Sequence, residues 1–167
     1  MRSWGQDEDE THFLNVDVDV WAKFPLDALV AAFGERVFVH YVGSEGKVFG
    51  AHFSIPGGGR DADRLTLRLV GLVSSLPKAA RGMWNRATSR EFDVGIQAGI
   101  KPHSSELRLE PTTLAAVARV HGRLVVTTYA AEVKSRKAPR LKARAAQQVD
   151  AADEVRAAAS RGRGPRS

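Results

Sequence analysis

The chain has 167 residues, a length that fits one domain of common size with an extension. It contains no cysteine, which excludes disulfides, thiolate metal sites and a cysteine nucleophile. Its net charge of +6 is distributed unevenly: residues 1–133 hold 15 Lys and Arg against 16 Asp and Glu, whereas residues 134–167 hold 10 against 3. The high charge therefore belongs to the last segment, and the preceding part of the chain is almost neutral.

The two ends of the chain differ in composition from its middle. Residues 1–11 are acidic, and we expect them to be disordered. They do not contain the apolar core of a signal peptide. Residues 134–167 have few large apolar side chains, which predicts a basic, low-complexity tail that is disordered or partly helical. Residues 12–133 are expected to form a single domain. No apolar run approaches the roughly 20 residues of a membrane span, and we expect a cytoplasmic bacterial protein.

The first half of the domain shows three strands and one helix. Residues 13–21 alternate apolar and polar side chains, which predicts a half-buried strand. A short helix is expected between Pro25 and Gly34. Strands are predicted over 37–42 and 48–55, since the glycines between them suit a hairpin turn.

The second half begins with a longer helix. Either Asp61 or Asp63 can cap this helix, which is expected to continue to residue 87 with a kink or restart at Pro77. Another alternating strand is predicted over 91–100. Leu107 and Leu109 predict a short edge strand. A last helix is expected from Pro111 to Gly122, followed by a strand over 124–130.

This order of elements predicts an α+β fold. The first six elements match a ferredoxin-like βαββαβ core, which a further short strand, a helix and a strand would extend. The helices would cover one face of a mostly antiparallel sheet and leave the other face open. In such a core the first strand is central, between the third and the fourth.

Residues of the second half carry a resemblance to a known family. The positions are Asp93, Gly95, Leu109, Pro111, Leu114, Ala118, Gly122 and Tyr129. They resemble the uncharacterised bacterial family called domain of unknown function 4279, which ends with a strand, a helix opened by Pro and a strand closed by Tyr. The resemblance covers about half of the chain and implies a small α+β protein of the immunity type. It brings no catalytic residues.

Enzymatic motifs are not found in the sequence. The five histidines show no metal-ligand spacing: His12, His40, His52, His103 and His121. Two Ser-x-x-Lys matches, at Ser44 and Ser75, are too short to indicate a nucleophile. We therefore expect a protein that is not an enzyme, with no cofactor and no metal ion.

The polar side of the predicted strands is the candidate site. Its side chains come from three neighbouring strands: Asn15, Asp17, Asp19, His52, Asp93 and Gln97. One interpretation is an acidic surface that recognises a partner. Another is a divalent-cation site of Asp17, Asp19 and Asp93, which lacks a supporting His or Glu cluster. The third is a solvated sheet face without a role.

Two functions follow from these observations. The leading hypothesis is a non-enzymatic protein-binding module, of the kind represented by bacterial immunity proteins, which presents its acidic sheet face to a basic partner such as a toxin. The alternative is non-specific nucleic-acid association through the tail. That alternative rests on one basic run: Lys134, Arg136, Lys137, Arg140, Lys142 and Arg144.

Overall fold

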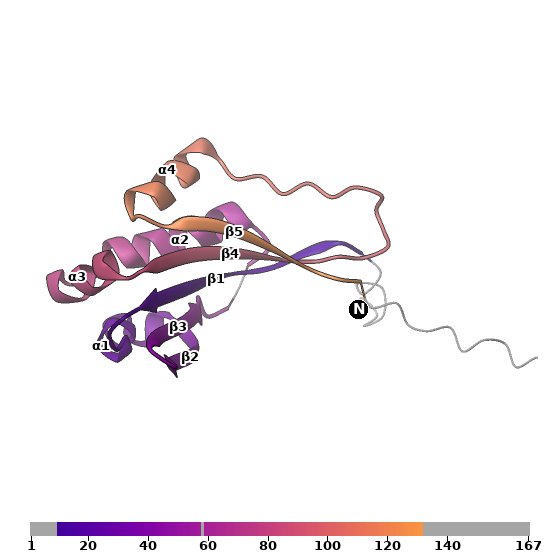
Figure 1. Ribbon diagram of the computed structural model, residues 1–167. Helices are drawn as coiled ribbons and strands as arrows, with labels where there is room; N and C mark the ends of the chain where they lie inside the picture. The colour runs from indigo at the N-terminus through magenta and orange to yellow at the C-terminus, as the bar shows by residue number, and fades with distance from the viewer. Residues whose placement is uncertain (1–9, 58, 132–167) are drawn as a thin grey trace, which may run out of the picture. The chain divides into compact units, whose positions relative to one another are not determined.

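A computed structural model of the chain describes residues 10–57 and 59–131. These residues form an α+β fold with one five-stranded mixed sheet and four α-helices (Figure 1). The strands are β1 (His12–Ala22), β2 (Phe38–Glu45), β3 (Val48–Ser54), β4 (Ser89–Gln97) and β5 (Arg123–Tyr129). The helices are α1 (Asp27–Ala31), α2 (Ala62–Ser74), α3 (Lys78–Arg86) and α4 (Pro111–Arg119), with a 3-10 turn over Gly34–Arg36.

The strands lie in the order β2-β3-β1-β4-β5. β1 pairs antiparallel with both β3 and β4, so the predicted central position of the first strand is confirmed. β2 and β3 form the expected hairpin, whose turn contains Gly46 at a positive φ of 63°. β4 and β5 are parallel and are connected through α4, which makes the sheet mixed.

The core lies between one face of the sheet and the helices. Val16, Val18 and Val20 of β1 are fully buried, while the intervening residues are partly exposed, as the alternating sequence predicts. Their buried neighbours in the core include Leu69 and Val73 from one side of α2. Burying this face against helices removes apolar surface from water, and the opposite face of the sheet carries the polar side chains.

Local sequence determines how α2, α3 and α4 begin and end. The Asp61 side chain caps α2 by accepting from the Arg64 backbone N–H at 3.1 Å. Pro77 separates α2 from α3, so the restart of the helix expected there is confirmed. α4 ends at Arg119, and the residue after it that takes the left-handed conformation is His121 (φ 56°), not Gly122 as the sequence suggested. Gly122 is required for another reason, because a Cβ there would lie 2.5 Å from the Phe92 ring.

The short edge strand predicted around Leu107 and Leu109 is wrong. The structure has no strand between β4 and α4, although both leucines are partly buried against the core. Their alternation therefore reflects side-chain packing by an extended segment that has no strand partner there. Within the described part of the chain, no helix is long and apolar enough to cross a bilayer.

Candidate functional site

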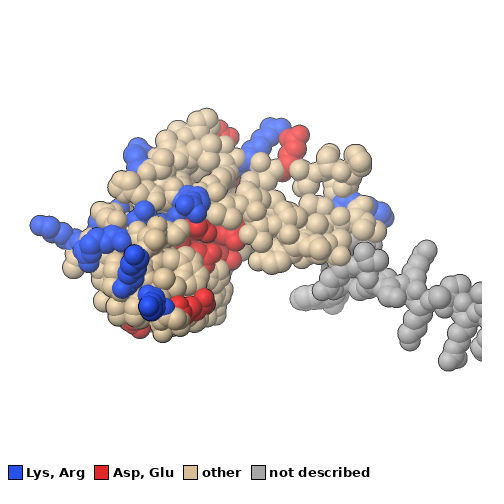
Figure 2. Space-filling model, viewed as in Figure 1, with Lys and Arg blue, Asp and Glu red and all other residues tan. Residues whose placement is uncertain are grey.

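The polar face of the sheet gathers the residues that the sequence singled out. Asp17 and Asp19 lie next to each other on the exposed side of β1, in the middle of the sheet. Across the strand pairs, Asp17 is opposite Asp93 of β4, and Asp19 is opposite His52 of β3. Figure 2 shows acidic side chains gathered over the strands near the middle of the view.

Asp17 and Asp93 are carboxylates at directly opposed positions of β1 and β4, and among the described residues neither forms an ion pair with Lys or Arg. Burial is the largest cause that raises the pKa of Asp17, and the charges of Asp19 and Asp93 raise it further. The neighbouring His52 and His40 lower it. Asp93 Oδ2 accepts a hydrogen bond from the Thr127 hydroxyl at 2.8 Å, whereas the buried Asp93 Oδ1 has no partner in the structure.

Positive charge is scarce around this acidic group. Among the described residues, the ion pairs of Asp17 and Asp19 are with histidines and not with Lys or Arg. Arg123, on the neighbouring β5, pairs instead with Glu91 at 3.0 Å. Like charges on directly opposed strand positions are destabilising, at about 0.2–1 kcal/mol for each pair. Repulsion between these carboxylates therefore lowers the stability of the fold slightly, and a bound cation or a basic partner would offset that repulsion.

His40 also belongs to this face, although the sequence did not indicate it. Counted back from the Val42–Ala51 pair, a regular hairpin would place His40 opposite Phe53, whose side chain is in the core; counted from the Phe38–Ser54 pair, it would place His40 opposite His52. The structure instead has a bulge between Val39 and Tyr41, and His40 is the additional residue. Its ring lies on the open face, where the His40 and His52 ring centroids are 4.9 Å apart.

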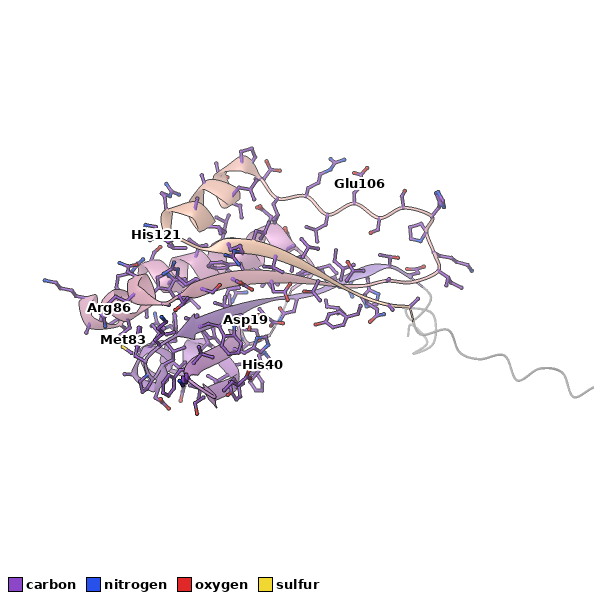
Figure 3. The ribbon with its side chains drawn as sticks, viewed as in Figure 1. Asp19, His40, Met83, Arg86, Glu106 and His121 are labelled. Carbon is purple, nitrogen blue, oxygen red and sulfur yellow. The ribbon has the colours of Figure 1, made fainter. Side chains whose placement is uncertain are left out.

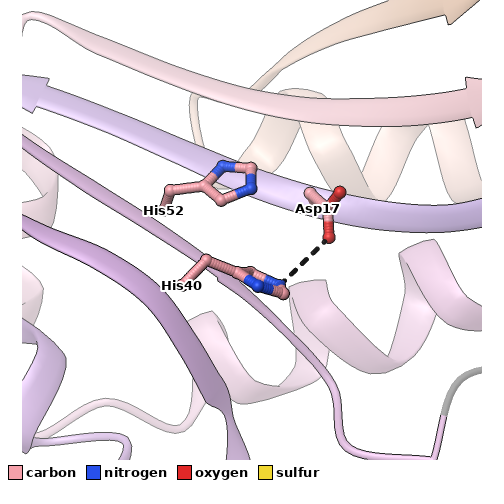
Figure 4. A group of neighbouring side chains, drawn as sticks. All are labelled: Asp17, His40 and His52. Carbon is pink, nitrogen blue, oxygen red and sulfur yellow. Dashed lines mark ion pairs between the residues drawn. The ribbon is translucent and has the colours of Figure 1, made fainter. Parts of the chain in front are cut away.

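Asp17, His40 and His52 form a compact cluster on the face (Figure 4). One potential ligand atom from each residue lies within 4.8 Å of those of the other two, and Nε2 of His40 is 3.7 Å from Oδ1 of Asp17. Figure 3 labels Asp19 and His40 among the side chains of the strands, while His121 lies at the end of α4. This group is one carboxylate and two imidazoles, a different set from the three aspartates considered in the sequence.

Hydrogen bonds orient each member of the cluster. His52 Nδ1 bonds to the Asp19 carboxylate, and the Asn15 amide donates to Asp17 Oδ1 at 3.0 Å. His40 Nε2 lies 2.8 Å from the hydroxyl oxygen of the buried Ser54. Asn15 and Asp19 are therefore supporting residues, which fix the side chains that make up the cluster.

Gln97 lies away from the cluster, at the end of β4. Its amide donates to the backbone carbonyls of Ala98 and Ala130, at 3.1 and 3.0 Å, and so ties together the ends of β4 and β5. Of the six residues predicted for the face, the structure groups Asp17, Asp19, His52 and Asp93 closely, with Asn15 beside them. The basic run 134–144 predicted for nucleic acid lies outside the described residues.

Large side chains border the polar group on the same face. The Trp21 ring covers Gly50 of β3, where a Cβ would lie 2.7 Å from it. Phe38 packs edge-on against His40, with ring centroids 4.9 Å apart, and is itself 58% exposed. An acidic centre beside exposed aromatic side chains is a surface that combines charge with apolar contact area.

Comparison with known proteins gives no relative from which a role could be transferred. No family model matches the chain, and neither a curated protein nor a solved structure matches it at a significant level.

Proposed function

We propose that the protein is a non-enzymatic protein-binding module that acts in the cytoplasm and presents the open face of β1, β3 and β4 to a basic partner. The immunity type, in which that partner is a toxin, comes from the sequence resemblance alone. The observation that carries the proposal is the group of half-buried carboxylates on the open face. A basic partner would supply the counter-charge that the described residues do not.

The fold supports the proposal by holding this face rigidly. The three aspartates lie on two neighbouring central strands, each paired on both sides, so their spacing does not depend on loop conformation. We also infer that β1 to β4, with α1 and α2, form a ferredoxin-like unit, since their strand order and antiparallel pairing are those of a split βαβ arrangement. In that arrangement the helices occupy the other face and leave this one free.

The test compares two charge-matched double variants in partner capture. Asp17→Asn with Asp19→Asn removes two carboxylates from the face, and Glu35→Gln with Glu106→Gln removes two exposed carboxylates outside the sheet. We expect the full chain to capture a specific protein from lysate of its own host. The purified partner should then bind the Asn variant at least about 10-fold more weakly than the Gln variant, and more weakly as salt rises.

Two results would contradict the proposal. One is a partner that binds both double variants equally and without dependence on salt, because binding would then not use the acidic face. The other is the absence of any specific partner, together with no effect of Asp17→Lys and Asp19→Lys when the chain is tested for protection against a co-expressed candidate toxin.

A further inference from the structure

We propose that Asp17, His40 and His52 bind one divalent transition-metal ion of the zinc class on the open face of the sheet. Two imidazole nitrogens and one carboxylate oxygen would be the protein ligands, and solvent would complete the coordination. This inference is independent of the proposed function, since such an ion can bind whether or not the face also binds a protein.

The spacing of the three side chains suits such an ion. Ligand atoms about 2.0–2.2 Å from a tetrahedral zinc ion are about 3.3–3.6 Å from one another. In the structure, His40 Nε2 and Asp17 Oδ1 are 3.7 Å apart, and all three ligand atoms lie within 4.8 Å of one another. Small side-chain rotations would close the remaining distance, because these residues are partly exposed and their backbones are fixed by strand pairing.

Asp19 already orients one of the ligands. An ionised carboxylate only accepts hydrogen bonds, so the proton of a neutral His52 ring is on Nδ1, which donates to Asp19. The lone pair is then on Nε2, and Figure 4 shows this edge of the ring turned toward Asp17. A carboxylate that holds the second nitrogen of a histidine ligand is a common outer-shell feature of metal sites.

The surrounding charge also favours a cation. Asp19 and Asp93 lie beside the cluster, and the buried oxygen Asp93 Oδ1 has no hydrogen-bond partner in the structure. The described ion pairs of the face leave these carboxylates without Lys or Arg. A bound ion of charge +2 would attract each of them and would offset their mutual repulsion.

The ligand types select the class of metal. Imidazole suits zinc, copper, nickel and iron, whereas magnesium and calcium prefer sites made of oxygen ligands. His40 and His52 have side chains 36% and 35% exposed, which gives solvent access to the remaining coordination positions. The inference is therefore a partly open site with two histidines and one aspartate that discriminates against magnesium.

The experiment titrates ZnCl₂, and separately MgCl₂, into the untagged full chain after treatment with a chelator, by isothermal titration calorimetry. We expect one zinc ion per chain with a dissociation constant in the micromolar range or below, and no measurable magnesium binding. His40→Ala and His52→Ala should each weaken zinc binding at least about 10-fold, and Asp19→Asn should weaken it by about 10–100-fold. His103→Ala, which removes an exposed histidine outside the cluster, should leave the affinity unchanged.

A second measurement uses the unmodified chain, so its result does not depend on whether the variants fold. Zinc added to ¹⁵N-labelled protein should shift the imidazole signals of His40 and His52 and leave those of His103 and His121 in place. Substitution of cobalt for zinc should give the visible absorption of a tetrahedral site. The inference is overturned if zinc does not bind, if magnesium binds equally well, or if the shifted histidine signals are not those of His40 and His52.

Discussion

Replacement of Asp17 by Asn should stabilise the metal-free protein at neutral pH. The Asp17 carboxylate is half-buried, lies opposite Asp93 across the β1–β4 pair, and has Asp19 beside it, His52 on the adjacent β3 and His40 on β2. Asn has nearly the same shape, and its carbonyl can still accept the hydrogen bond that Asn15 donates to Oδ1. The substitution therefore removes the charge and keeps the packing.

The expected gain follows from the burial of the Asp17 carboxylate, which is the largest cause that raises its pKa, and from the like charges of Asp19 and the opposed Asp93. A like-charged pair directly across two strands costs about 0.2–1 kcal/mol, so the free energy of unfolding should rise by that amount near pH 7.5. The pKa of the Asp17 carboxyl is raised in the folded protein above its unfolded value of 3.8. Protonation of this group therefore stabilises the fold, and the contribution is complete below pH 3.8. That contribution is lost as the pH rises through the folded pKa. The advantage of Asn should consequently shrink as the pH falls toward pH 4.

Urea denaturation followed by circular dichroism, near pH 7.5 and near pH 4, measures this difference. Glu45→Gln is the matched control, since Glu45 is an exposed carboxylate at the end of β2; it should change the free energy of unfolding by less than about 0.5 kcal/mol. An Asp17→Asn variant that is less stable than wild type near neutral pH, or whose advantage grows toward pH 4, would refute the electrostatic reasoning.

Other predictions concern the packing of the domain and the basic tail. Gly50→Ala should cost about 1–3 kcal/mol of stability by displacing the Trp21 ring, whereas Gly71→Ala, in an open position of α2, should gain about 0.5–1 kcal/mol; both are measured by urea denaturation. Trp84→Phe should cost about 1–3 kcal/mol in the same assay, because it leaves a void and removes a 2.8 Å hydrogen bond to a buried carbonyl. If the chain binds duplex DNA, removal of 134–167, which changes the net charge from +6 to −1, should abolish that binding in a salt titration; equal binding by the truncated chain would show that the tail is not responsible.

The sequence was sufficient to predict the central part of the fold. The strict alternation in residues 13–21 identified both a strand and its two faces, so the shared polar face of Asp17 and Asp19 could be predicted before the structure was known. The same kind of alternation gave a wrong strand at Leu107 and Leu109. An extended segment that buries one side against the core shows this alternation even when its backbone pairs with no strand. The two-residue alternation of apolar and polar side chains therefore indicates which side chains face the core, but it does not indicate whether the backbone pairs with a strand of a sheet.

The composition of the candidate site was predicted only in part. Asp17, Asp19, His52 and Asp93 could be placed from strand order, because each follows the two-residue period of its own strand. His40 could not, since the two-residue period counted from the buried Val37 puts it on the open side, whereas counting back from the Val42–Ala51 pair puts it on the core side, and only the position of the bulge decides between the two. A bulge depends on how two strands pair, which local sequence does not determine.

The bulge in β2 also affects how the edge of the sheet behaves in solution. β2 is an outer strand with exposed apolar side chains, among them Phe38, Val39 and Val42. A regular edge of this composition would be a template for pairing with a second chain, and thus for aggregation. The extra residue at His40 interrupts the even spacing of backbone donors and acceptors and twists the strand locally. The residue that completes the histidine pair thus also makes this edge of the sheet a less regular template for edge-to-edge association.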